Sequence, residues 1–195
     1  MGGGDGDRAR HIVLRAADLP GEGWEAVADP ELPTEPDPDD DLEGCLTGFP
    51  DADVTASATS PRFTRGDALA WSVAWVLAGE GAAGAAYTRL ADEGFASCFV
   101  AATAAEVDPH AGAATLLGPV GEPVEEVAGP HHGARHRARL TAATAEGLLA
   151  IHLELVALQR ERAVTLVILA DSPDPVPPAH GRAVARRVAA RLATT

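Results

Sequence analysis

Three arginines alternate along a stretch of sequence whose period-two spacing indicates a β-strand. Arg135, Arg137 and Arg139 occupy every second position, so in a strand their side chains all point to one face of the sheet. A guanidinium group presents several N–H donors in a geometry that matches a carboxylate or a sulfate-like anion. The spacing therefore predicts either cross-strand ion pairs or one wall of a site for an anionic ligand.

The strand expected next along the chain carries side chains that could meet these arginines. His152 and Glu154 share one face of the segment 148–159. Its opposite face is aliphatic and consists of Leu149, Ile151, Leu153 and Leu155. If the two strands pair, His152 and Glu154 lie beside the arginines. A His–Glu pair covered by a helix could then act as general acid and base.

Two tryptophans fall on one face of the segment 69–77, which alternates large and small residues. Trp71 and Trp75 share that face with Leu69 and Val73, and we interpret them as core residues. The alternative is that they line an apolar cavity.

These observations place a candidate ligand site between the arginine face of the sheet and the helix or loop that covers it, with Trp71 or Trp75 as an apolar wall. The site residues are Trp71, Trp75, Arg135, Arg137, Arg139, His152 and Glu154. An equally open alternative is that the arginines pair internally, with Glu154 or with the acidic loop at 35–43.

No motif for nucleotide binding, nucleophilic catalysis or zinc binding is present. The densest histidine cluster is His131, His132 and His136. On a strand, His132 and His136 would lie about 13 Å apart, too far for both to bind one metal ion. We expect solvated or edge-strand histidines, no metal and no cofactor, and we assign no catalytic residue.

Length and charge limit the classes of function. The chain has 195 residues, 46% of them hydrophobic and 23% charged, as in one globular domain spanning 1–195. The net charge of -14 disfavours binding to nucleic acid or to an anionic membrane surface. No apolar run is long enough for direct membrane insertion. The composition leaves the oligomeric state open.

Local composition divides the chain further. Residues 1–7 are rich in glycine and aspartate, which predicts a flexible N-terminus, and 29–43 predicts an exposed acidic loop rich in proline and aspartate. The order of acidic residues in that loop does not match a calcium-binding loop. All fifteen basic residues are arginine, which with the abundant alanine and glycine indicates a GC-rich genome such as that of an actinobacterium.

Hydrophobic periodicity predicts the elements. We expect helices at 7–17, 79–107 with a break near Gly94, and 179–192. We expect strands at 54–64, 69–77, 119–127, 132–144, 148–159 and 162–170. The short links favour antiparallel pairing. The fold class is therefore α+β, with an antiparallel sheet of five or six strands packed by the N-terminal, middle and C-terminal helices.

A set of short features is similar to a known family. A helix ending near Leu14 leads through Leu19-Pro20-Gly21 to Trp24, a cysteine follows the Pro/Asp-rich stretch, and a later helix carries Cys98-Phe99. This pattern resembles the extracytoplasmic sensor domain of some actinobacterial Ser/Thr protein kinases and its lipoprotein relatives, and more loosely the Mog1/PsbP-like α/β sandwich. The resemblance implies a binding or sensing role without catalytic residues.

The same resemblance pairs Cys45 with Cys98. A disulfide there would restrict the unfolded chain by about 4 kcal/mol. The alternative is two reduced thiols in a cytosolic protein. Residues 1–5 do not form a signal peptide. An extracytoplasmic location therefore requires that a leader or anchor was removed, and a cytoplasmic location fits the sequence as written.

The leading hypothesis is a non-catalytic ligand-binding or sensory module, for an unknown small or anionic ligand. The alternative is a cytoplasmic, cyclase-like biosynthetic enzyme or accessory protein that uses an α+β cavity. A third possibility is a structural partner subunit, which would present a large apolar patch.

Overall fold

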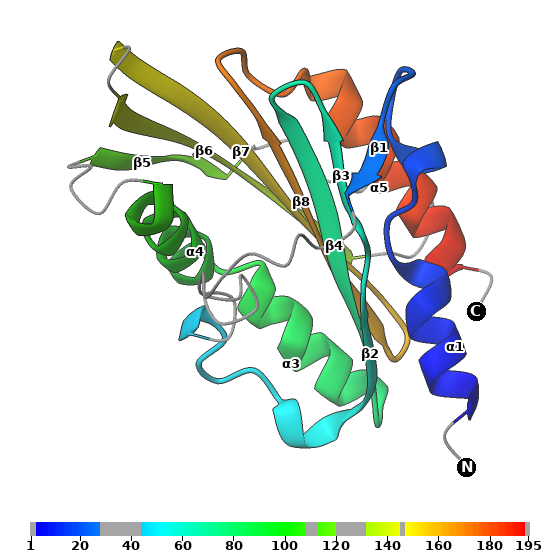
Figure 1. Ribbon diagram of the computed structural model, residues 1–195. Helices are drawn as coiled ribbons and strands as arrows, with labels where there is room; N and C mark the ends of the chain where they lie inside the picture. The colour runs from blue at the N-terminus through cyan, green and yellow to red at the C-terminus, as the bar shows by residue number, and fades with distance from the viewer. Residues whose placement is uncertain (1–2, 28–43, 108–112, 120–131, 145–146, 194–195) are drawn as a thin grey trace.

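A computed structural model describes residues 3–27, 44–107, 113–119, 132–144 and 147–193 (Figure 1). Its helices are α1 (Gly3–Ile12), the short 3-10 helices η1 (Ala16–Asp18) and η2 (Asp51–Asp53), α3 (Glu80–Leu90), α4 (Glu93–Val107) and α5 (Pro178–Leu192). Its strands are β1 (Glu25–Val27), β2 (Val54–Thr59), β3 (Arg62–Arg65), β4 (Ala68–Leu77), β5 (Ala113–Pro119), β6 (His132–Thr144), β7 (Gly147–Arg160) and β8 (Ala163–Asp171).

The strands form one sheet in the order β1-β3-β4-β8-β7-β6-β5, and β2 also pairs with β4. Every strand pair is antiparallel. The α+β class and the antiparallel meander of β6, β7 and β8 are confirmed. The described sheet has eight strands rather than five or six, partly because the first arm of the expected hairpin is divided into β2 and β3.

The division lies at Ser60 and Pro61, where proline has no N–H to give to the ladder. The Ser60 backbone N–H donates to the Ser72 carbonyl at 2.9 Å. In return the Ser60 hydroxyl oxygen accepts the Ser72 N–H at 2.9 Å. A side chain thus replaces a backbone partner, so that β2 and β3 both lie along β4 despite the break.

Helices cover both faces of the sheet (Figure 1). Helices α1 and α5 pack on one face, where their buried residues include Ile12, Val184 and Val188. Helices α3 and α4 pack on the other, with Leu90 and Phe95. Because both faces are buried, β8 is apolar on successive residues rather than on alternate ones, and its burial is continuous from Ala163 to Leu169.

The first helix differs from its expected position. It begins at Gly3, so residues 3–7, which we expected to be flexible, are helical, and Asp7 pairs with Arg10 at 2.6 Å within the helix. It ends at Ile12 because the next residues turn onto the sheet, where the Leu14 N–H donates to the Ser72 hydroxyl at 2.7 Å. The expected loop at 29–43 lies outside the described residues.

The other boundaries follow the hydrophobic pattern closely. The expected helix at 79–107 is divided between Leu90 and Glu93, and the C-terminal helix begins one residue earlier than expected, at Pro178. The strand expected at 119–127 falls mostly on residues outside the described ranges, whereas the structure has β5 at Ala113–Pro119.

Candidate functional site

The arginine face predicted from sequence exists, and Glu154 lies at its centre. In the β6–β7 register Arg137 is opposite Glu154, and Arg139 is opposite His152. Arg135 Nε donates to Glu154 Oε1 at 2.9 Å, and Arg137 Nε donates to Glu154 Oε2 at 3.1 Å. One carboxylate therefore holds two of the three arginines.

This cluster is closed to solvent because α5 crosses directly over it. The side chains of Arg135 and Glu154 are 2% and 1% exposed. A Cβ on Gly181 of α5 would lie only 1.8 Å from Glu154 Oε1, so glycine alone allows the helix to approach this closely. A ligand could reach Arg139, which is exposed, and the 27% of the Arg137 side chain that remains open, but it could not reach Arg135 or Glu154.

The tryptophans do not contribute to this face, which corrects the expected joint site. Trp75 is buried on the opposite side of the sheet, with its ring centroid 5.1 Å from that of Phe49. Trp71 is half-buried against the same cluster, and the Arg62 guanidinium lies over its ring. Alternation along β4 explains the separation, since Ala70 and Ala74 face α1 and α5 while Trp71 and Trp75 face α3 and α4.

The histidine cluster also differs from expectation. His136 is buried rather than solvated, and its Nε2 lies 3.1 Å from the Ala91 carbonyl oxygen, between α3 and α4. Its strand β6 is not an edge strand either, because β5 pairs with it. Burial lowers the pKa of its imidazole. His132 is exposed beside the Tyr87 ring, and His131 lies outside the described residues. Within the described ranges no three His, Cys, Asp or Glu side chains gather as metal ligands do.

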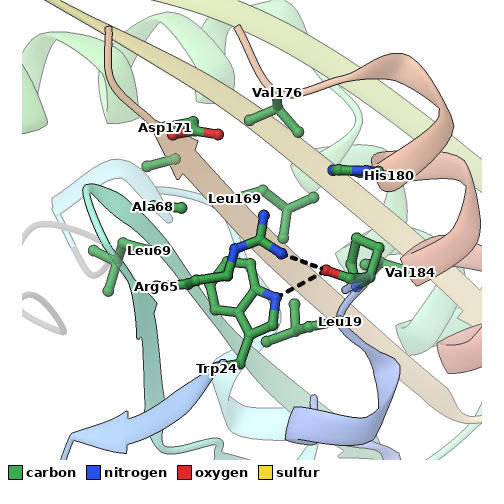
Figure 2. A pocket seen from close by; sticks show the side chains of 12 residues that line it. Leu19, Trp24, Arg65, Ala68, Leu69, Leu169, Asp171, Val176, His180 and Val184 are labelled. Atoms are coloured by element: carbon green, nitrogen blue, oxygen red, sulfur yellow. Dashed lines mark hydrogen bonds between the residues drawn. The ribbon is translucent and has the colours of Figure 1, made fainter. Parts of the chain in front are cut away.

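A pocket opens on the α5 side of the sheet, near the beginning of that helix (Figure 2). Its volume of about 20 Å³ holds one or two water-sized groups, and it opens to solvent. Four segments supply its walls: the chain after η1, the β3–β4 turn, the end of β8 and the first turns of α5. Its apolar lining includes Leu19, Ala68, Leu169, Val176 and Val184.

Trp24 and Arg65 form one wall of this pocket as a unit. The Arg65 guanidinium carbon lies 4.7 Å from the centre of the Trp24 ring, a cation–π distance. The indole N–H of Trp24 donates to the Pro20 carbonyl at 3.0 Å, and Arg65 Nη1 donates to the same oxygen at 2.8 Å (Figure 2). The shared acceptor fixes both side chains against the turn that follows η1.

Asp171 and His180 supply the other polar groups. Asp171 Oδ1 accepts the Ser172 N–H at 2.9 Å. Among the residues that the structure describes, no side chain forms an ion pair with Asp171, and none hydrogen-bonds to the His180 imidazole. This contrasts with Glu154, whose two oxygens are both bound internally. Charged groups at the pocket therefore keep donors and acceptors that no described residue uses.

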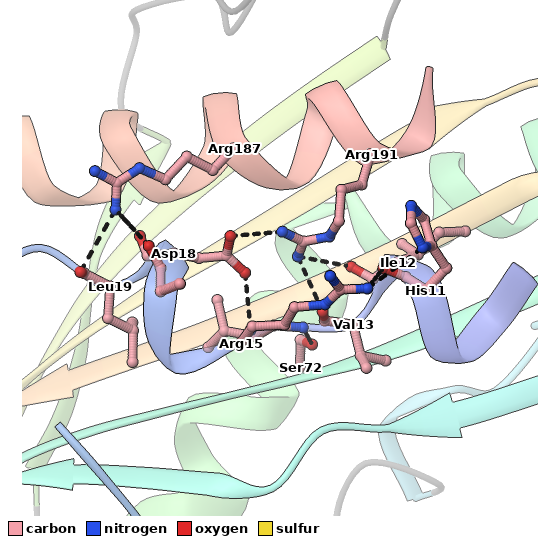
Figure 3. A network of polar contacts seen from close by, with 11 residues as sticks. His11, Ile12, Val13, Arg15, Asp18, Leu19, Ser72, Arg187 and Arg191 are labelled. Carbon is pink, nitrogen blue, oxygen red and sulfur yellow. Dashed lines mark hydrogen bonds and ion pairs between the residues drawn. The ribbon is translucent and has the colours of Figure 1, made fainter. Parts of the chain in front are cut away.

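A buried ion pair positions the wall that carries Trp24 (Figure 3). Arg191 of α5 donates to the Asp18 carboxylate and, through Nη2, to the carbonyl oxygens of Ile12 and Val13 at 3.1 and 2.9 Å. The latter are carbonyls at the end of α1, which the helix itself leaves without partners. Arg187 Nη1 donates to the carbonyls of Ala17 and Asp18. Helix α5 thus fixes the chain immediately before the pocket.

A disulfide joins Cys45 to Cys98, with their Cα atoms 5.6 Å apart and 53 residues between them in sequence. It attaches the segment before η2 to α4, on the face of the sheet opposite the pocket. Arg89 supports the same segment by donating to the Cys45 and Thr47 carbonyls. The pairing implied by the resemblance is confirmed.

Comparison with known proteins adds little to this geometry. No protein-family model and no curated protein matches the sequence. Among solved structures, the extracellular domain of PknH from Mycobacterium tuberculosis is similar at 11% sequence identity, with a TM-score of 0.39 and 95% of each chain covered.

The pocket residues were not predicted as a site. Trp24 belonged to the features behind the family resemblance, but Arg65, Asp171 and His180 have no common motif or spacing. Gly181 left a weak signal, because glycine is unfavourable inside a helix and can mark a position where the helix packs closely. None of the helices in the described part of the chain is both long and apolar enough to cross a membrane.

Proposed function

We propose that this chain is a non-catalytic binding or sensory module that works in an oxidising, extracytoplasmic compartment, with the α5-side pocket as its ligand site. The observation that supports it most is the contrast between two sets of charges on one sheet face. Both carboxylate oxygens of Glu154 are bound by Arg135 and Arg137 beneath α5, and Arg137 Nη2 is buried without a hydrogen-bond partner among the described residues. Arg65, Asp171 and His180 instead surround an apolar floor that is open to solvent, with donors and acceptors that no described residue uses. Convergent polar groups over an apolar floor are typical of ligand sites.

The arrangement of reactive groups favours binding over catalysis. Both cysteines are in the disulfide, so neither is a free nucleophile. Among the described residues, no hydrogen bond links a histidine to a hydroxyl group, as activation of a serine or threonine would need. A cyclase-like enzyme would have to enclose its substrate, and sites that do so have volumes of about 300–1,000 Å³, far above that of this pocket.

The disulfide supports the proposed compartment. Structural disulfides persist in secreted and extracytoplasmic proteins and are rare in a reducing cytosol. Mass measurement with thiol alkylation, on protein recovered from its native compartment, tests this point. We expect no alkylation of Cys45 and Cys98 before reduction and alkylation of both after it. Two free thiols would contradict the proposed location.

The binding role is tested by two-dimensional NMR of the labelled protein against a panel of small polar and zwitterionic compounds. We expect at least one compound to shift the indole N–H of Trp24 and the backbone signals of Asp171 and His180. The indole signals of Trp71 and Trp75, on the other face of the sheet, serve as the internal control. Shifts at the control signals alone, or at none of these positions, would contradict the proposal.

A further inference from the structure

We infer that the pocket takes a small zwitterionic α-amino acid with a short apolar side chain; this rests on the proposed function and names the ligand class of the same site. Its ammonium group would bind Asp171, its carboxylate would bind Arg65, and its side chain would enter the apolar floor. Three features of the pocket carry this inference: the separation of its charges, their unused binding capacity, and the size of the floor.

The first feature is a pair of opposite charges held apart across the sheet. Arg65 on β3 is in register with Ala68 on β4, and the pairing of Leu69 with Ala170 places Ala68 beside Asp171 on β8. The three residues thus form one row on one face, with Arg65 and Asp171 two strand spacings, about 9.6 Å, apart. Ala68 between them is too small to fill the gap, and no ion pair between described residues closes it.

The second feature is that each charged group is held in place by one hydrogen bond and still has donor or acceptor atoms for a ligand. Arg65 Nη1 donates to the Pro20 carbonyl, and the guanidinium group lies over the Trp24 ring. Its Nε and Nη2 have no hydrogen-bond partner among the described residues. Asp171 Oδ1 accepts the Ser172 N–H, and Asp171 Oδ2 has no hydrogen-bond partner among the described residues. A group held by one bond and free at another loses little side-chain entropy when it binds a ligand.

The charges also exclude simpler ligands. A simple anion that binds Arg65 would meet the Asp171 carboxylate across the gap, and a simple amine that binds Asp171 would meet the Arg65 guanidinium. A ligand that carries both charges satisfies both groups and cancels both repulsions. The His180 imidazole, on the α5 side of the same pocket, adds a hydrogen-bonding group for either end of such a ligand.

The third feature is the floor, which limits the side chain. Leu169, Val176 and Val184 are buried and present only carbon to the pocket. A volume of about 20 Å³ admits a methyl-sized group, so the head group of the ligand must stay at the open rim, where the charges are. Alanine matches these dimensions, whereas a leucine or phenylalanine side chain would not enter.

The probe is L-alanine, titrated by NMR and compared with propionate, which lacks the ammonium group, and ethylamine, which lacks the carboxylate. We expect alanine to shift the Trp24 indole, Asp171 and His180 signals, and to bind at least about tenfold more tightly than either analogue, because each lost charge-assisted bond costs about that factor. Asp171→Asn and Arg65→Gln should each weaken alanine binding about tenfold.

Matched controls separate the site from general effects. Asp174→Asn changes an exposed carboxylate close to Asp171 in sequence, and Arg62→Gln changes an arginine of β3 that faces the opposite side of the sheet. Both should bind alanine as the native protein does. If Arg65→Gln disturbs the Trp24 wall, seen as a shifted indole signal without ligand, Asp171→Asn decides the test.

Three outcomes would overturn the inference. Propionate or ethylamine binding as tightly as alanine would show that one of the charges is not recognised. N-acetylalanine or alaninamide binding equally well would point to a peptide instead. Finally, alanine could fail to bind while another compound of the panel shifts the pocket signals. The ligand class would then be wrong and the proposed function would stand, whereas both fail if no compound moves those signals.

Discussion

The backbone of Gly181 in α5 lies against the carboxylate of Glu154 in β7, so close that a Cβ there would lie 1.8 Å from Oε1 and 2.9 Å from Arg135 Nη2. The contact sets the height of α5 above the sheet. It also closes the arginine cluster and leaves the pocket at the beginning of the helix as the open part of this face.

Gly181→Ala should therefore destabilise the protein although alanine favours helices. The added methyl group must push α5 off the sheet or displace a buried ion pair, and we expect a loss of at least about 3 kcal/mol in the free energy of unfolding. Urea denaturation measures it. Gly84→Ala in α3 is the matched control, because a Cβ there meets nothing within 4 Å; it should stabilise by about 0.5–1 kcal/mol. Equal effects at the two glycines would contradict the close contact.

Glu154→Gln should be far more damaging than a change to Arg139, the arginine of the same strand face that Glu154 does not bind. It leaves Arg135 buried without a compensating charge, which costs about 3–5 kcal/mol. Arg139→Gln, at an exposed position, should change stability by less than about 0.5 kcal/mol. Chemical denaturation of both variants tests the order. A mild Glu154→Gln together with a severe Arg139→Gln would mean that the ion pairs are not arranged as described.

The stability of the fold should fall on acidification through His136. Burial holds the pKa of its imidazole below 6.5, against weaker opposing effects of the Ala91 carbonyl, Glu93 and Asp92. Because the unfolded chain then takes up this proton before the folded one does, the stabilisation is complete above about pH 6.5 and is lost as the pH falls from there towards the folded-state pKa.

Melting temperatures between pH 8 and pH 5 isolate this effect. His136→Gln, which can still donate to the Ala91 carbonyl but does not titrate, should show a shallower loss of stability with falling pH than the native protein. His132→Gln, at an exposed position of the same strand, should keep the native slope. A native slope in His136→Gln would show that another group is responsible.

Asp18→Asn should weaken both the fold and the pocket. The substitution leaves Arg191 without its buried carboxylate, and we expect a loss of about 3 kcal/mol in the free energy of unfolding. Because η1 leads into the Trp24 wall, the Trp24 indole signal should shift in the variant before any ligand is added. Asp7→Asn breaks an exposed pair with Arg10 and should cost under about 1 kcal/mol without moving that signal.

The sequence by itself determined the elements and their class. Hydrophobic periodicity and short links predicted the bounds of β6, β7 and β8 almost to the residue, although β8 is apolar on successive residues because both of its faces are buried. The same periodicity brought Arg135, Arg137 and Glu154 onto one face. The pairing of Cys45 with Cys98 was implied by the family resemblance alone.

Only the tertiary structure decided what each face meets. Periodicity states which residues share a face but not which helix lies on it, so the sequence could not show that Trp71 and Trp75 lie across the sheet from the arginines, or that Gly181 closes over Glu154. The pocket depends still more on distant segments. Trp24, Arg65, Asp171 and His180 come from four parts of the chain with no common spacing. Long-range strand pairing and the packing of α5 bring them together, and no local pattern encodes such contacts.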